Sequence, residues 1–196
     1  MLAVHARFRG TSNHRAEYVQ RSAEALSTLP EVGAFEFVGV EDIRTTVATA
    51  EALCDVVMAL LADGSWAIGI GIALGDAPAA ASNALTNRAR AGQVYVQQSG
   101  DCYPELSTKV AKTKARTTAE NISAAFALLG YVLNKRTPEG REATALVRSG
   151  LNQNEAAAKL DISKQAMSQR LQAAGWSAET AGWQLAVNLL SDASST

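Results

Sequence analysis

The sequence predicts an α/β layer domain followed by an all-α domain in one chain of 196 residues. Short β-forming runs alternate with helical patterns through residue 106, and beyond it apolar residues recur mainly at helical spacing. Charge divides the chain in a similar way. Residues 1–108 carry 7 Lys or Arg against 12 Asp or Glu, whereas residues 109–170 carry 11 against 5. An acidic first half followed by a basic segment is typical of a chain with two roles.

The strands of the first domain are predicted from runs rich in β-branched and aromatic residues. These runs are 2–10, 33–42, 66–74 and 93–98, with room for one more strand within 31–45. In the third run, Gly69 and Gly71 alternate with isoleucines, so one face of that strand is nearly bare. Bare glycines in a strand allow a helix or another backbone to approach closely.

Helices are predicted between these strands, giving the order β-α-β-α-β-α-β. One lies within 11–30, where Thr11 or Ser12 can cap its start and Pro30 closes the segment. The second spans 45–62 and the third 79–92, with a glycine at its end. The predicted α/β domain therefore covers residues 1–106.

A basic segment and a strong helix follow, and together they form a predicted connecting region, 107–135. Residues 107–117 hold four basic residues and no acid, which indicates either a linker or the lead into a helix. The helix is predicted over 118–134 because Ile122, Phe126 and Leu129 recur at helical spacing. Its apolar stripe fits a rigid connector and a dimer interface equally well.

The last predicted domain, 136–196, opens with three short helices. The first is expected over Pro138–Arg148 and ends at a glycine. Asn152 and Glu155 have the spacing of a capping box at the start of the second. Ser163 is placed to cap the third helix. Ala157 is small where two helices are expected to cross, and Leu160 and Ile162 flank the turn. Met167 and Leu171 are expected to face the core from the third helix.

This stretch resembles the helix-turn-helix of sigma factors and many bacterial repressors. The resemblance implies that the third helix enters the major groove of double-stranded DNA. The implied DNA-binding residues are Ser163, Lys164, Gln165, Ser168, Gln169, Arg170 and Gln172. Glutamine pairs with adenine, and lysine or arginine with guanine or phosphate. The turn carries Asp161 where the family usually has glycine, and aspartate tolerates positive φ better than most residues.

Two further expectations accompany this resemblance. Cations outside the third helix are expected to contact phosphates, namely those of segment 109–116 and Lys135, Arg136, Arg141 and Arg148. A homodimer is expected because one small module buries little DNA surface and paired half-sites add affinity. A final helix, capped by Ser177, either closes the small domain or pairs two chains. The alternative reading of the whole stretch is a plain helical hairpin with a polar surface.

The first domain resembles the second half of a class III nucleotide cyclase through "AIGIGIALG", "ASNALTNRARA" and "GQVYVQ". The overall layout is similar to SatD-like proteins, a shortened cyclase fold with a terminal pair of DNA-binding helices. The resemblance implies a ferredoxin-like or cyclase-like sheet. The first strand has no acidic residue, and the hairpin has Gly33-Ala34 where the family has Gly-Asp, so both metal-holding aspartates are missing.

These observations predict a transcription regulator rather than an enzyme, with no cofactor and no metal. The first domain is expected to mediate dimerisation, to sense a small-molecule effector such as a nucleotide, or both. A nucleotide-processing enzyme and a protein-binding adaptor remain the alternatives. Cys54 and Cys102 lack metal-ligand spacing and indicate free thiols in a cytoplasmic, nucleoid-associated protein without a membrane partner. His5 is assigned to packing or the surface, and Ser82 has no evident base partner.

Overall fold

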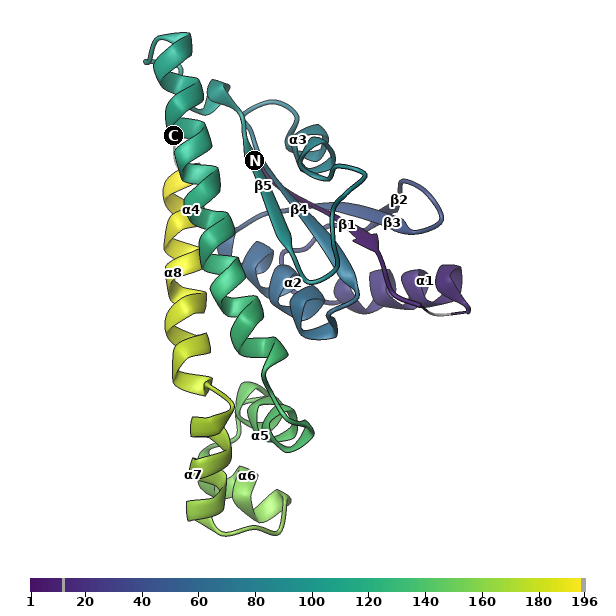
Figure 1. Ribbon diagram of the computed structural model, residues 1–196, viewed down its shortest axis with the longest axis vertical. Helices are drawn as coiled ribbons and strands as arrows, with labels where there is room; N and C mark the ends of the chain where they lie inside the picture. The colour runs from purple at the N-terminus through teal and green to yellow at the C-terminus, as the bar shows by residue number, and fades with distance from the viewer. Residues whose placement is uncertain (12, 195–196) are drawn as a thin grey trace.

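A computed structural model describes residues 1–11 and 13–194. Five strands from the first half of this range form one sheet. The strand order is β2-β3-β1-β4-β5 (Figure 1). The strands are β1 (Leu2–Phe8), β2 (Glu36–Phe37), β3 (Asp42–Val47), β4 (Trp66–Ile72) and β5 (Val94–Gln98). β1 pairs antiparallel with β3 and β4, while β5 runs parallel to β4. The α/β class expected for this half of the chain is therefore confirmed.

Helices cover both faces of the sheet because side chains alternate along each strand. The three helices are α1 (Arg15–Leu26), α2 (Ala50–Asp63) and α3 (Ala77–Ala84). Val4 and Ile68 face the core that contains α1 and α2, whereas Ala3 packs against α3. A Cβ atom on Gly69 or Gly71 would fall inside contact distance of the α3 backbone. The close approach expected at these two glycines is confirmed.

Two long helices run side by side along the sheet domain in opposite directions (Figure 1). They are α4 (Thr108–Asn134) and α8 (Trp176–Ser194), and a single 3-10 turn, Gly100–Cys102, precedes α4. Residues 108–117, for which a linker was one expectation, form the first turns of α4. Phe126 of α4 and Leu190 of α8 are both fully buried in the same core as the sheet. The final helix therefore completes the main core rather than closing a separate small domain.

Three short helices form a compact unit at the end of the α4–α8 pair that lies far from the sheet (Figure 1). They are α5 (Pro138–Arg148), α6 (Gln153–Lys159) and α7 (Lys164–Ala173). Their own core contains Ala143, Ala157, Met167 and Leu171, separate from the main core. The chain enters this unit from α4 and leaves it into α8. Because residues 138–173 lie at the far end of this helix pair, we call them the tip unit.

Several boundaries differ from the sequence prediction. The strand expected over 33–42 is reduced to Glu36–Phe37. α3 ends at Ala84, not near residue 92, because Leu85 leaves helical geometry and its side chain packs against the sheet. The helix expected over 45–62 begins only at Ala50, since residues 42–47 pair with β1 as a full strand. The last helix begins at Trp176, one residue before the expected Ser177 cap. None of the described helices combines the length and the apolar character that crossing a membrane requires.

Candidate nucleic-acid interface

The entry to α6 is fixed by the capping box that the sequence predicts. The Asn152 side chain accepts hydrogen bonds from the backbone N–H groups of Asn154 and Glu155, at 2.9 and 3.1 Å. The Glu155 carboxylate in turn accepts from the backbone N–H of Asn152 at 2.8 Å. Three backbone N–H donors at the helix start are thereby satisfied, which sets where α6 begins and how it is oriented.

The chain turns between α6 and α7 over four residues, 160–163. Asp161 occupies the left-handed region with a φ of 52°, as its place in the turn requires. The backbone N–H of Ile162 then returns to the carbonyl of Ala157 at 3.0 Å. Ser163 caps α7 by accepting from the backbone N–H of Ala166 at 3.1 Å. These local bonds fix the angle between the two helices.

We expect Asp161→Gly to stabilise the chain by about 1 kcal/mol relative to Asp161→Ala, because only glycine enters the left-handed region without a Cβ penalty. Asp161 is exposed, so neither change disturbs packing. Urea denaturation of the two variants measures the difference. Equal midpoints would show that the turn stores no backbone strain.

The outer face of α7 carries polar side chains that have no partner among the residues the structure describes. Lys164, Gln165, Ser168, Gln169 and Gln172 are all exposed, while Met167 and Leu171 on the other face are buried. Within the described ranges these five side chains form no hydrogen bond or ion pair. α7 contains no acidic residue. The face is therefore free to bind an external group, and its charge favours an anionic one.

Two of the seven predicted DNA-binding residues, Arg170 and Ser163, are not part of this free face. Arg170 lies at its side rather than in its centre. Arg170 is half-buried and lies 3.9 Å from Glu142 of α5. At that distance the pair is weak because both groups keep much of their solvent contact. Ser163 is exposed, but its hydroxyl oxygen is already used as the cap of α7.

One expected phosphate contact is wrong. Arg136 is 7% exposed and holds the tip unit together instead of reaching solvent. Its Nε donates to the carbonyl of Ala174 at 2.8 Å, and its Nη2 pairs with Glu179. The second carboxylate oxygen of Glu179 pairs with Arg148, whose guanidinium is about half exposed. This Arg136–Glu179–Arg148 cluster joins the end of α4, α5 and α8.

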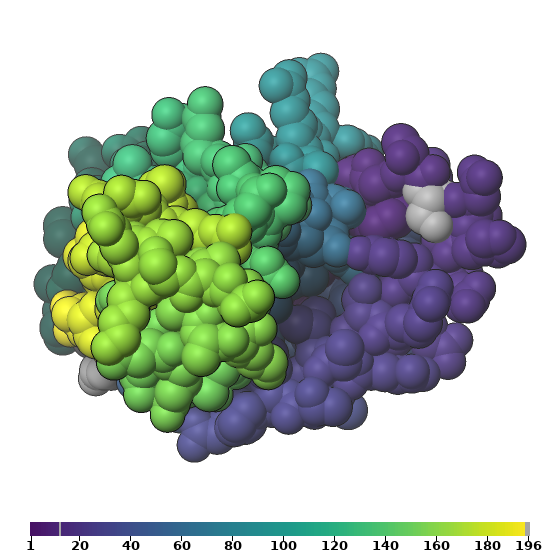
Figure 2. All heavy atoms as spheres, turned by 90° about the horizontal axis from the view of Figure 1, so that it is seen from below, coloured from purple at the N-terminus to yellow at the C-terminus, as the bar shows by residue number. Residues whose placement is uncertain are grey.

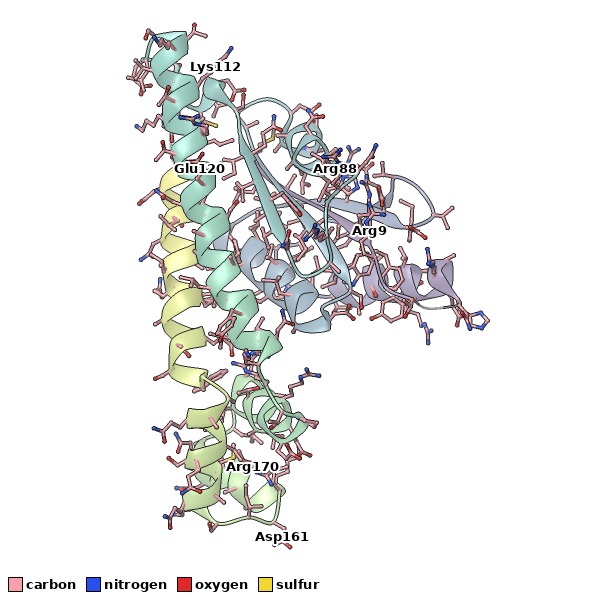
Figure 3. All side chains as sticks on the ribbon, viewed as in Figure 1. Arg9, Arg88, Lys112, Glu120, Asp161 and Arg170 are labelled. Carbon is pink, nitrogen blue, oxygen red and sulfur yellow. The ribbon has the colours of Figure 1, made fainter. Side chains whose placement is uncertain are left out.

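The basic segment 109–116 also lies in the wrong place for the same interface. It forms the start of α4, whereas the tip unit follows the end of that helix; Lys112 and Arg170 lie at opposite ends of the molecule (Figure 3). Since a helix rises 1.5 Å per residue, roughly 33 Å of α4 separate Lys112 from the tip unit. Lys135 and Arg141 are exposed and close to the tip unit in sequence, so they remain available for phosphates.

In the first domain, a polar cluster that the sequence does not reveal lies between the sheet and α3. His5 is 2% exposed in the central strand. Its Nδ1 is 2.9 Å from the Ser82 hydroxyl, and its Nε2 is 3.3 Å from Asp42, which also binds Arg7. The expectation that Ser82 has no base partner is wrong, because only the fold brings residues 77 positions apart together. Burial lowers the pKa of His5, against the opposing effect of Asp42.

The bonds of this cluster point to an anchoring role for Ser82. Its hydroxyl donates to the carbonyl of Pro78 at 3.0 Å and also lies 3.0 Å from Nη1 of Arg44. The Ser82 hydroxyl therefore bridges α3, β1 and β3, which suits a residue that holds α3 against the sheet. Among the described residues, no group of three or more His, Cys, Asp or Glu side chains is placed to hold a metal ion.

No protein-family model, curated protein or solved structure matches this chain. The resemblances to helix-turn-helix and cyclase-like proteins rest on residue patterns.

Proposed function

We propose that the protein binds double-stranded DNA in a sequence-specific manner and regulates transcription, with α7 as the helix that enters the major groove. The observation that carries the proposal is the exposed polar face of α7, which has no partner within residues 1–11 and 13–194, at the outermost end of the molecule. Gln165 and Gln169 each have an amide N–H donor and a carbonyl acceptor, which together can read the edge of adenine. The Lys164 side chain can donate to guanine or to a phosphate. The capped start of α7 adds free backbone N–H groups that favour a phosphate.

The helix-turn-helix assignment is further supported by the order of parts in the tip unit. A short helix, a turn at Asp161 and a second helix capped by Ser163 follow one another, with α5 packed behind both. A plain helical hairpin requires neither the positive φ at Asp161 nor a polar face without acidic residues. Both features agree with a helix pair that presents its second helix to a duplex.

We assign the first domain to a degenerate cyclase-like fold of the SatD-like type. The elements β1-α1-β2-β3-α2-β4, with β1 between β3 and β4, have the order and pairing of a ferredoxin-like unit. β1 presents no carboxylate, and Ala34 stands where the family's Gly-Asp pair would place its second aspartate. Gly33 and Ala34 were expected in the hairpin, but they precede β2 and lie outside the turn between β2 and β3. This domain accordingly serves assembly or sensing rather than catalysis, and no cofactor is proposed.

A homodimer is supported by the outer face of the α4–α8 pair. Leu128 and Tyr131 of α4 are 68% and 65% exposed, and Leu185 of α8 is 49% exposed. Gly182 packs against Leu129, so these three side chains lie at a similar level along the α4–α8 pair. Exposed large apolar side chains on neighbouring helices are typical of a protein–protein contact. A second copy related by a two-fold axis that runs along the α4–α8 pair would bring two α7 helices to one end of the assembly.

The decisive experiment begins with the DNA that the tagged protein binds in its host, from which a shared sequence is identified. Binding to a duplex with that sequence and to a scrambled duplex is then measured by fluorescence anisotropy. We expect Gln165→Ala and Gln169→Ala each to weaken specific binding by about 1–3 kcal/mol while leaving the scrambled duplex unaffected. Lys164→Ala should lower the salt slope by about 1.

Gln184→Ala is the matched control, since Gln184 is exposed on α8 away from the tip unit. Equal losses on the two duplexes for the α7 variants would mean that these residues do not read bases. Absence of any DNA enrichment would remove the proposal. Binding of a protein partner that is insensitive to salt would then favour the adaptor, and turnover of ATP or GTP with Mg²⁺ would favour the nucleotide-processing enzyme.

A further inference from the structure

A cavity of about 430 Å³ lies between α2, α8 and the end of α5. Seen from below, the surface is hollowed between the green-to-yellow C-terminal helices and the purple-to-blue N-terminal part (Figure 2). Much of the cavity wall is apolar and includes Trp176, Trp183, Met58 and Leu29. Its volume lies in the range of pockets that hold small organic molecules. Two tryptophans in one wall favour a ligand with a flat apolar body.

The charged groups of this pocket are not equivalent. Asp55 accepts one hydrogen bond from Nε1 of Trp183 at 2.9 Å, and no cation among the described residues pairs with it. Glu51, one turn earlier on α2, has no ion pair in the same range and adds a second negative charge near Asp55. In contrast, Arg148 and Glu179 at the other end already pair with each other, and Arg136 adds a second positive charge to Glu179.

We infer that this pocket binds a hydrophobic cation, an amine or quaternary ammonium carried on an aromatic or large apolar body. The apolar wall removes the body of such a ligand from water, and the free oxygen of Asp55 meets its charge. An anionic ligand would face Asp55 and the nearby Glu51, neither of which has an ion pair among the described residues. Arg148, the one cation in the lining, already pairs with Glu179, so the net charge around the pocket selects against anions.

The pocket also connects the main core to the tip unit. Arg148 is the last residue of α5, and its guanidinium lies 5.8 Å from the ring centre of Trp176 at the start of α8. A ligand between Trp176 and Trp183 touches both parts of the chain. Its binding therefore changes the orientation of the tip unit and the affinity of α7 for DNA, a consequence that rests on the proposed function.

The test uses three probes with one ring system and different charges: 2-naphthylmethylammonium, 2-naphthylmethanol and 2-naphthoate. Isothermal titration calorimetry of the full chain should show the cation binding about tenfold more tightly than the alcohol, with naphthoate weakest. Asp55→Asn should remove the preference for the cation while leaving the affinity for the alcohol unchanged. Asp192→Asn changes another exposed carboxylate of α8 that does not line the cavity, so it is the control and should change nothing.

Tightest binding of naphthoate, or no measurable binding of any probe, would overturn the inference. So would an unchanged preference for the cation in Asp55→Asn, which alters an exposed side chain and leaves the fold intact. Anisotropy with the identified duplex, repeated at saturating cation, should show a several-fold change in DNA affinity; an unchanged affinity would overturn the coupling. Because the calorimetry contains no DNA, its result stands whether or not the protein binds DNA.

Discussion

Glu179→Ala should destabilise the protein by about 3–5 kcal/mol, because it leaves the buried guanidinium of Arg136 without a counterion. Arg136 and Glu179 are 7% and 4% exposed, so water cannot replace the lost partner. The cluster also joins α4, α5 and α8, so the attachment of the tip unit should loosen. Urea unfolding, followed by circular dichroism, gives the free energy of unfolding of the variant and of the unaltered protein.

Arg148→Ala is the matched control for this prediction. It removes the other arginine of the cluster, whose side chain is 50% exposed, and Glu179 keeps its bond to Arg136. We expect a loss of about 1 kcal/mol or less, since exposed ion pairs contribute little. Comparable losses in Glu179→Ala and Arg148→Ala would show that burial of Arg136 does not determine the strength of the cluster.

Gly71→Ala should destabilise the protein by about 3 kcal/mol, since the added methyl group has no room. Its Cβ would fall against the carbonyl oxygen of Ala77 and the backbone nitrogen of Ala81, and a helix backbone cannot move aside as a flexible side chain can. Either α3 lifts from the sheet or β4 shifts away from its partners. The loss is measured as the change in the free energy of unfolding in urea.

Gly39→Ala provides the comparison, because a Cβ at Gly39 meets nothing within 4 Å. Its expected effect lies within about 0.5 kcal/mol of zero. A similar loss at both glycines would point to a general cost of replacing glycine in this chain. A negligible loss at Gly71 would show that α3 is held only loosely against the sheet.

The features that the sequence predicts correctly are those set by neighbouring residues. The capping box of Asn152 and Glu155, the cap at Ser163 and the positive φ at Asp161 each depend on a few consecutive residues. Gly69 and Gly71 were also informative, since alternation along a strand indicates the face that another backbone approaches.

The features that the sequence does not predict depend on contacts between distant segments. The burial of Arg136 requires Glu179, which lies 43 positions later. The residues next to Arg136 in the sequence do not distinguish it from the exposed cations nearby. The partnership of His5 and Ser82 spans 77 positions. The early end of α3 follows from the packing of Leu85 against Ala67 and Ala89, which a helical pattern in the sequence cannot reveal.

The position of α8 determines when the front half of the protein can be completed. Val187 and Leu190 form part of the same core as α2 and the sheet, yet they are synthesised after the whole tip unit. A nascent chain that ends before Trp176 has all five strands but leaves the apolar surfaces of α2 and α4 open to water. During translation the tip unit, with its own small core, can therefore become native before the sheet domain that precedes it.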